Sequence, residues 1–274
     1  MLGQDLTAHL AAGHQVVPAD LPEVDITDLG LFQRTLDSTK PDVVIHAAAF
    51  TAVDECETRQ ELAFRVNGEG TRNVAQACRE NRVPLLYIST DYVFDGEKET
   101  PYLEDDTPHP INVYGHSKLQ GETHISALVG HFWIVRTSWL FGPRGKNFVR
   151  AILERARLKG LLQVVDDQVG APTYTMDLAE KLEHIVARGG PGIYHVTNRG
   201  YCSWFDFAEE VIQQAGLSQV KISPVPTSAL DRPAPRPRNS RLANNRLETE
   251  GLGLLPPWQD ALRRYLLREG QAKG

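Results

Sequence analysis

Tyr114 and Lys118 stand four residues apart in the stretch NVYGHSKLQGE, which covers residues 112–122. This spacing places both side chains on one face of an α-helix. A phenol ordinarily titrates at about pH 10, and a neighbouring ammonium group stabilises its phenolate and lowers its pKa. Such a pair could protonate the alkoxide that forms when a hydride is delivered to a ketone. The spacing therefore predicts a site of ketone reduction.

Other polar and small residues follow apolar segments that read as strands. Thr90 and Asp91 end one such segment, three alanines and Thr51 end another, and Asp20 ends a third. In a doubly wound sheet, ligands bind at the carboxyl ends of the strands. Thr90 could donate a second hydrogen bond to the reacting oxygen. Asp20 is placed to accept hydrogen bonds from a ribose diol.

The Tyr-x-x-x-Lys spacing is a weak signal by itself. The alternative is an exposed helix face with a solvated lysine, and for the bare motif it is favoured by roughly three to one. The surrounding pattern reverses this preference, because a serine and a threonine end an apolar strand about two dozen residues earlier.

Short apolar segments alternate with amphipathic ones along the chain. Strand–helix–strand alternation predicts an α/β fold with a doubly wound, parallel, Rossmann-type sheet. The predicted strands cover residues 14–20, 41–49, 84–90, 132–140, 161–167 and 192–198. The predicted helices cover residues 3–12, 27–38, 57–81, 114–129, 146–159, 175–188, 203–215 and 256–268.

The pattern loosens after about residue 143, where helices surround a proline-rich loop at 224–238. We expect an NAD(P)-binding domain over 1–143 and a smaller α/β substrate-binding lobe over 144–274, with segment 192–198 returning to the main sheet. Guanidinium groups near the loop could bind a diphosphate or form a solvated basic surface, and the two interpretations are about equal. The arginines concerned are Arg232, Arg236, Arg238, Arg241 and Arg246.

Composition excludes several classes of protein. The 274 residues carry a formal net charge of −6, so no basic field favours nucleic acid or an anionic membrane. Three scattered cysteines argue against a disulfide framework or zinc site and favour a reducing, cytoplasmic location. No apolar run approaches the ~20 residues of a membrane helix. The start also lacks the pattern of a signal peptide.

Several motifs occur together in a fixed order. They are HAAAFTAVDECE (46–57), VNGEGTRNVAQAC (66–78), STDYVFDG (89–96), NVYGHSKLQGE (112–122), RTSWLFG (136–142), DDQVGAPTYTMDLA (166–179) and RPRNSRL (236–242). The chain resembles an extended short-chain dehydrogenase/reductase, and most closely the dTDP-4-dehydrorhamnose reductase family, from residue 1 to about residue 262.

The resemblance implies a role for individual residues. Tyr114 would be the proton donor, Lys118 its partner and a ligand of the nicotinamide ribose, and Thr90 the third catalytic group. Asp91 and Trp139 match positions that contact the nucleotide-sugar. The positions around the adenosine half and the pyrophosphate of NADPH or NADH match Asp20, Asp25, Ile26, Ala49, Phe50 and Thr51.

Some of these residues have structural alternatives. Trp139 could belong to the core, as aromatic residues in apolar strands usually do. Asp25 could cap a helix that begins in the stretch DITD. Asp166 and Asp167 could form a turn.

The implied reaction is NAD(P)H-dependent reduction of dTDP-4-dehydro-L-rhamnose to dTDP-L-rhamnose. A sugar-nucleotide epimerase or 4,6-dehydratase is one alternative, but such dehydratases carry a glutamate where Tyr92 follows Asp91. A non-catalytic subunit similar to the regulatory subunit of methionine adenosyltransferase is the other. Intact Tyr114 and Lys118 favour catalysis. The resemblance also admits Mg²⁺ and a homodimer, although no residue pattern indicates either.

Asp20 also bears on the choice of cofactor. The following residues, LPEVD, offer no arginine for a 2′-phosphate, and a carboxylate would repel that group. The sequence therefore favours NADH over NADPH.

The start of the chain, MLGQDLTAHL, resembles the end of a dinucleotide-binding turn. In this fold a buried strand leads through G-x-x-G-x-x-G into a helix whose N-terminus holds the pyrophosphate. Gly3 would be the third glycine, and 14–20 the second strand. We therefore expect the sequence to lack the first strand. We also expect the protein made from Met1 to be poorly soluble or to bind dinucleotide weakly.

Overall fold

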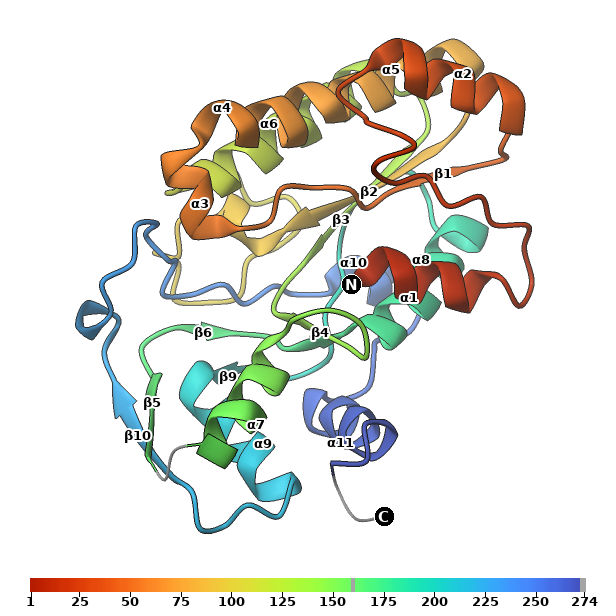
Figure 1. Ribbon diagram of the computed structural model, residues 1–274. Coiled ribbons are helices and arrows are strands. Elements are labelled where there is room, and N and C mark those ends of the chain that lie inside the picture. The colour runs from red at the N-terminus through yellow and green to blue at the C-terminus, as the bar shows by residue number, and fades with distance from the viewer. Residues whose placement is uncertain (159–160, 272–274) are drawn as a thin grey trace.

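The computed structural model describes residues 1–158 and 161–271. Its centre is a parallel sheet in the order β1-β2-β3-β8 (Figure 1). These strands span Val44–His46, Leu85–Thr90, Phe132–Thr137 and Gly192–His195, respectively. Thr90 pairs with Thr137, so the carboxyl ends of β2 and β3 lie side by side. The predicted α/β class with a doubly wound parallel sheet is confirmed.

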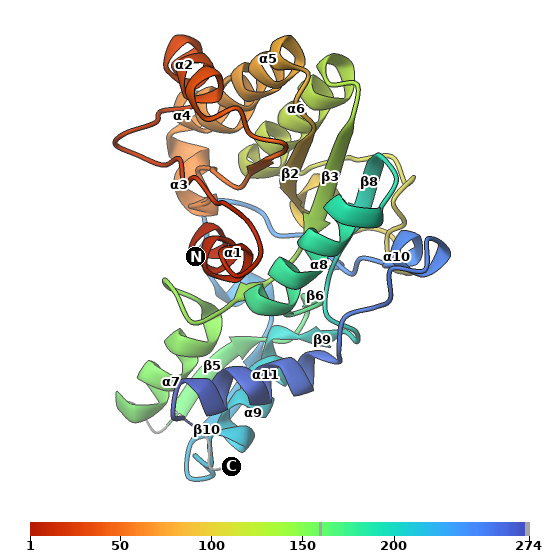
Figure 2. The ribbon, with the colours of Figure 1, turned by 90° about the vertical axis from the view of Figure 1, so that its right-hand side faces the viewer.

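Helices cover both faces of this sheet, as the alternation of side chains along β2 requires. Leu85 and Tyr87 face one core, while Leu86 and Ile88 face the other. The first face is covered by α2 (Leu29–Thr39), α5 (Thr71–Asn81) and α6 (Val113–Leu128). The second is covered by α1 (Leu2–Leu10) and α8 (Thr175–Arg188), which pack against each other (Figure 2).

The prediction of a strand at 14–20 is wrong. This segment is irregular and largely exposed, and Val17 retains 53% of its accessible surface. In the described chain, β1 is the edge of the sheet, and 14–20 makes no backbone ladder with it. An extended segment without a neighbouring strand has no partner for its N–H and C=O groups except water, so it forms no strand.

The predicted helix at 57–81 is divided into shorter elements. They are α3 (Val53–Thr58), α4 (Gln60–Ala63), the π-helix η1 (Phe64–Gly70) and α5. A Cβ added to Gly121 of α6 would lie 2.8 Å from the carbonyl oxygen of Asn67, so α6 passes very close to η1. π-Helical turns are rare and occur frequently at functional sites.

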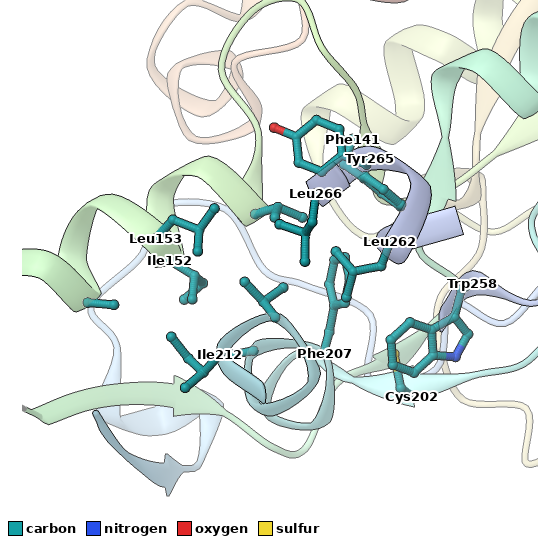
Figure 3. Close-up of a cluster of buried hydrophobic side chains, with 14 of the residues drawn as sticks. Phe141, Ile152, Leu153, Cys202, Phe207, Ile212, Trp258, Leu262, Tyr265 and Leu266 are labelled. Atoms are coloured by element: carbon teal, nitrogen blue, oxygen red, sulfur yellow. The ribbon is translucent and has the colours of Figure 1, made fainter. Parts of the chain in front are cut away.

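A second core lies below the main sheet in Figure 1 and is drawn in close-up in Figure 3; the part of the chain around it is called the lower lobe. Its helices are α7 (Phe148–Leu158), α9 (Trp204–Gln214) and α11 (Trp258–Arg268), which pack around Phe141, Phe207 and Tyr265. Paired short strands border it: β4 (Leu140–Phe141) with β7 (Thr173–Tyr174), β5 (Leu161–Val165) with β10 (Lys221–Val225), and β6 (Val169–Gly170) with β9 (Cys202–Ser203).

The chain crosses between the two cores more than once. β8 pairs with β3 in the main sheet, and α8 and the short helix α10 (Asn245–Thr249) also contribute to the core of that sheet. The division into domains at residue 143 stays a prediction. No helix in the part of the chain that the structure describes is long and apolar enough to cross a membrane.

Candidate functional site

The first turn of α6 carries Tyr114 to the carboxyl edge of the sheet. Asn112 caps this helix, because its Oδ1 accepts a hydrogen bond from the N–H of Gly115 at 2.8 Å. A Cβ on Gly115 would lie 2.1 Å from the carbonyl oxygen of Tyr92. Glycine therefore lets the helix approach the short 3₁₀ helix η2 (Asp91–Val93), which follows β2 directly.

Tyr114 is buried in a small apolar cluster with Cys56 and Ala63. The ring of Tyr92 meets it edge-on, with 5.6 Å between ring centroids. Burial raises the pKa of the Tyr114 phenol, and a hydrogen bond with Thr90 opposes this only in part. The lowering of the pKa that was expected from Lys118 is therefore not found. Tyr114 holds its proton at neutral pH, as a proton donor must.

Lys118 lies one turn further along α6 and is almost fully buried. Its Nζ donates a hydrogen bond to the carbonyl oxygen of Ile88 at 2.8 Å and lies 4.0 Å from the centroid of the Tyr87 ring. Burial lowers the pKa of Lys118 to about 7, although the carboxylate of Glu122 favours the charged form. Lys118 therefore anchors α6 to β2 beneath Tyr114.

Thr90 and Asp91 lie at the end of β2, as predicted from the sequence. Thr90 Oγ1 donates a hydrogen bond to Asp91 Oδ1 at 3.0 Å. Asp91 is 2% exposed, and burial raises its pKa to about 7. The Ser240 and Thr90 hydroxyls oppose this rise in part, but among the described residues no donor forms a hydrogen bond of ordinary geometry with Asp91 Oδ2. A buried carboxylate oxygen without a partner is costly in a folded protein and marks a position where a ligand could donate a hydrogen bond.

Trp139 follows β3 with a backbone φ of +47°, which is strained for a residue with a bulky side chain. Its indole stacks on that of Trp204, with centroids 3.5 Å apart and planes 7° apart. A Cβ on Gly170 would lie 2.5 Å from the same indole. Trp139 packs against the second core, as the structural alternative expected, yet it remains partly exposed. It thus lies where the catalytic edge meets the lower lobe.

Asn67 of η1 is a site residue that the sequence reading missed. Its side chain holds both backbone groups of Phe50, accepting from the N–H at 2.8 Å and donating to the C=O at 3.0 Å. It also donates to Ser117 Oγ at 2.9 Å. One buried amide therefore joins the loop after β1 to the catalytic helix. Ala49 and Phe50 are half-buried in this loop, and Thr51 is exposed.

The remaining predicted cofactor residues are distributed along the irregular segment and the first helix. Asp20 is exposed, and Ile26 packs in the core between the sheet and α2. Asp28, and not Asp25, caps α2. Asp25 accepts hydrogen bonds from Thr27, and these lower the pKa of Asp25. Gly3 lies in the first turn of α1, with open space around it.

The arginines near the proline-rich loop differ in their contacts. Arg236 pairs with Asp54, Arg241 donates to Asn239, and Arg246 pairs with Glu250. Arg232 and Arg238 are exposed. Arg232 also lies 3.6 Å from Oδ2 of Asp54, so Arg238 is the exposed member of the group without an ion pair in the described chain. Whether any of these arginines contacts a diphosphate stays a prediction.

Asp167 ties the loop after β5 to the same region. Its carboxylate accepts hydrogen bonds from the N–H of Thr227 at 2.9 Å and from its hydroxyl at 2.5 Å. Within residues 1–158 and 161–271, no group of three histidine, cysteine or acidic side chains could hold a metal ion. The structure thus offers no support for the Mg²⁺ admitted by the resemblance.

His46, at the end of β1, is a buried histidine whose protonation should destabilise the folded protein in acid. Burial lowers the pKa of His46 from 6.5 to about 3, and the charge of Lys118 adds to this effect. His46 is therefore neutral in the folded protein at neutral pH. The folded protein keeps its full stability above pH 6.5, the pKa of this histidine in the unfolded chain. As the pH falls below that value, the unfolded chain binds a proton that the folded protein does not, and the free energy of unfolding decreases. By pH 5 this amounts to about 2 kcal/mol. We expect His46→Asn to reduce the loss of melting temperature between pH 7.5 and pH 5.

The exposed His116, which forms no ion pair in the described chain, provides the control, since His116→Asn should leave the pH dependence as in the wild type. Equal slopes of melting temperature against pH for His46→Asn and the wild type would contradict the assignment.

The family model described as "RmlD substrate binding domain" matches residues 1–270. The chain belongs to this family. The dTDP-4-dehydrorhamnose reductase from Streptomyces griseus is 42% identical over 96% of this chain and 88% of the relative. The spore coat polysaccharide biosynthesis protein SpsK of Bacillus subtilis is 39% identical over 99% of this chain and 95% of the relative.

A solved structure supports the same assignment. The dTDP-4-dehydrorhamnose reductase of Bacillus anthracis, crystallised in complex with NADP, superimposes on this chain with a TM-score of 0.95. It is 38% identical, and the match covers 97% of this chain and 95% of the other. The RmlD family thus accounts for both the main sheet and the lower lobe.

Proposed function

We propose that this chain is an NAD(P)H-dependent dTDP-4-dehydrorhamnose reductase, which reduces the C4 ketone of dTDP-4-dehydro-L-rhamnose to give dTDP-L-rhamnose. The observation that carries the proposal is the buried, protonated phenol of Tyr114 beside Thr90 and above Lys118 at the carboxyl edge of the sheet. Named reductases of 38–42% identity over most of the chain support the same reaction.

The residues at this edge fit a nicotinamide dinucleotide. The first N–H groups of α1 have no acceptor within the helix, and Gly3 leaves open space there, as an anionic pyrophosphate requires. Asn67 fixes the loop at Phe50, and the carbonyl oxygen of Ile88 on β2 fixes the ammonium group of Lys118. When bound, the reduced nicotinamide supplies the hydride.

Tyr114 then completes the reduction. As a hydride reaches C4, the C=O π-electrons move to the oxygen, and Tyr114 Oη gives its proton to that oxygen. Thr90, at the end of β2, would donate to the same oxygen by turning its hydroxyl hydrogen away from Oδ1 of Asp91. Asp91 Oδ2, which has no partner in the described chain, would accept a hydrogen bond from a sugar hydroxyl. Trp139 would contact the nucleotide-sugar from the side of the lower lobe.

The sibling activities fit this site less well. Where the 4,6-dehydratases carry a glutamate, this chain has Tyr92, and its ring packs against Tyr114. No carboxylate is therefore present at that position to act as the extra acid or base. A purely regulatory role would not require a protonated phenol next to Thr90 at the carboxyl edge of the sheet.

Turnover of the proposed substrate tests the function and the cofactor together. We expect the purified protein to oxidise NADH or NADPH only when dTDP-4-dehydro-L-rhamnose is present, and to form dTDP-L-rhamnose. Because Asp20 would repel a 2′-phosphate, kcat/KM should be higher with NADH. Higher kcat/KM with NADPH would show the cofactor preference to be wrong. The absence of turnover with either cofactor would contradict the function itself.

Two further proposals concern the setting of the enzyme. The three cysteines are free and buried, which supports a reducing cytoplasmic location.

A homodimer is proposed on the family resemblance and is tested by light scattering of the purified protein.

A further inference from the structure

Asp54, at the start of α3, fixes the proline-rich loop after β10. Its Oδ1 lies 2.9 Å from Arg236 Nη2 and accepts a hydrogen bond from the N–H of Ala234 at 3.4 Å. Arg236 in turn donates through Nη1 to the carbonyl oxygen of Ala234 at 2.7 Å. The side chain of Arg236 is only 9% exposed. One carboxylate therefore holds both the backbone and the guanidinium group of this loop, which passes near α3 (Figures 1 and 2).

Contacts continue from Arg236 to Tyr114. The guanidinium carbon of Arg236 lies 5.9 Å from the centroid of the Tyr92 ring, within the range of a cation–π contact. The Tyr92 ring meets Tyr114 edge-on at 5.6 Å and 75°. Tyr114 also packs in a cluster with Cys56 of α3. The series of contacts therefore starts at Asp54 of α3, passes through Arg236 and Tyr92 to Tyr114, and returns to α3 at Cys56.

The same two elements hold the start of α6. Asn112, which caps the helix, donates through Nδ2 to the carbonyl oxygen of Pro235 at 2.9 Å. The N–H of Val113 donates to Oε1 of Glu57, on α3, at 2.9 Å. The turn that bears Tyr114 is thus bonded on one side to the proline-rich loop and on the other to α3.

We propose that Asp54 and Arg236 are positioning residues for Tyr114. They form a latch, here called the Asp54–Arg236 latch, that holds residues 231–240 against Tyr92 and the first turn of α6. Neither residue touches the reacting atoms, so they act through the placement of the phenol. The inference rests on the proposed reductase function, because it concerns proton donation by Tyr114.

An ordinary surface ion pair would contribute little, roughly 0–1 kcal/mol in general. The latch differs because the guanidinium group is buried and lies over a ring that touches the proton donor. Proton transfer is sensitive to such placement, since misplacing a reacting group by about 1 Å can cost about a hundredfold in rate.

The experiment compares Asp54→Asn, Arg236→Met and Arg236→Lys with a matched control. Glu55→Gln removes the neighbouring carboxylate of α3, which forms an exposed ion pair with Arg59 at 3.6 Å. We expect Asp54→Asn and Arg236→Met to lower kcat by about tenfold to a hundredfold, with little change in KM for the cofactor. Arg236→Lys should keep more activity, because it retains a cation beside Tyr92. Glu55→Gln should behave as the wild type.

Combining Arg236→Met with Tyr114→Phe separates an effect on the placement of the phenol from a general loss of structure. In Tyr114→Phe, which has no phenolic proton to place, Arg236→Met should lower the residual kcat no further. A further loss of the same size would overturn the proposal. So would unchanged kcat in both Asp54→Asn and Arg236→Met.

Hydrogen–deuterium exchange keeps the inference testable without turnover. If the latch exists, Asp54→Asn raises exchange in residues 113–116 and 231–240, whereas Glu55→Gln does not. Equal exchange in the two variants would overturn the latch even if the enzyme is active. Inactive wild-type protein would count against the proposed function alone, because the exchange measurement would still decide on the latch.

Discussion

Replacing Tyr114 with phenylalanine should lower kcat by about two to four orders of magnitude, the usual effect of removing a positioned general acid. The ring would still fill the pocket formed by Cys56, Ala63 and Tyr92. Only the proton that neutralises the C4 alkoxide would be lost. Binding of the reduced cofactor, followed by its fluorescence, should change little, because no other group moves. Steady-state kinetics with the ketone substrate measures the effect.

Tyr201 provides a matched control for the same change of side chain. It is 40% exposed and donates its hydroxyl hydrogen to the carbonyl oxygen of Leu242, outside the apolar cluster of Tyr114. Tyr201→Phe should therefore leave kcat within about twofold, as a surface substitution generally does. Wild-type turnover in Tyr114→Phe would remove this tyrosine from the mechanism.

The sequence could predict the parts of the site that depend on local spacing. Tyr114 and Lys118 share a helix face because they are four residues apart, and Thr90 ends β2 because an apolar run stops there. These statements need only helix geometry and the register of a buried strand. The parallel sheet and the return of segment 192–198 to it could likewise be predicted from the alternation of segments, whereas the pairing of β8 with β3 is known from the structure.

Contacts between distant segments could not be predicted in this way. Asn67 joins Phe50 to Ser117 across 17 and 50 residues of sequence, respectively, and Asp54 meets Arg236 from the far end of the chain. The one local signal at Asn67 is the Asn-Gly pair that it forms with Gly68, which is typical of a turn and does not indicate which groups the side chain binds. Trp204, which stacks on Trp139, had no distinguishing signal, because aromatic residues in an amphipathic helix usually pack in the core.

Two errors have the same physical origin. Segment 14–20 carries a strand-like pattern, but a strand also needs a neighbouring backbone, and the described chain provides none at that edge. The pKa of Tyr114 was expected to fall because a lysine is near, but burial of the phenol raises it. In each case a local pattern was outweighed by the surroundings that the tertiary structure imposes.

Glu122 and Arg136 form a fully buried ion pair whose disruption should give the largest loss of stability. Arg136 donates from Nε and Nη2 to the two carboxylate oxygens of Glu122 at 3.0 and 2.7 Å. Ser89 also donates to this carboxylate, at 2.5 Å. Because Glu122 lies on α6, one turn beyond Lys118, the pair joins the catalytic helix to β2 and β3.

Arg136→Met should lower the free energy of unfolding by about 3–5 kcal/mol, because it leaves the carboxylate of Glu122 buried with only Ser89 as a partner. In a chain of this length that corresponds to a fall of roughly 6–20 °C in melting temperature. Adding Glu122→Gln to Arg136→Met should raise the melting temperature again, since a neutral amide costs less to bury and still accepts from Ser89.

Arg263→Met is the matched control, because Arg263 pairs with Asp260 at 3.5 Å on an exposed helix face and should contribute less than about 1 kcal/mol. Differential scanning calorimetry of the four proteins measures these effects. A double variant less stable than Arg136→Met would show that the charge of Glu122 is not the source of the loss. Recovery in the double variant would instead show that the buried pair persists because each charge requires the other.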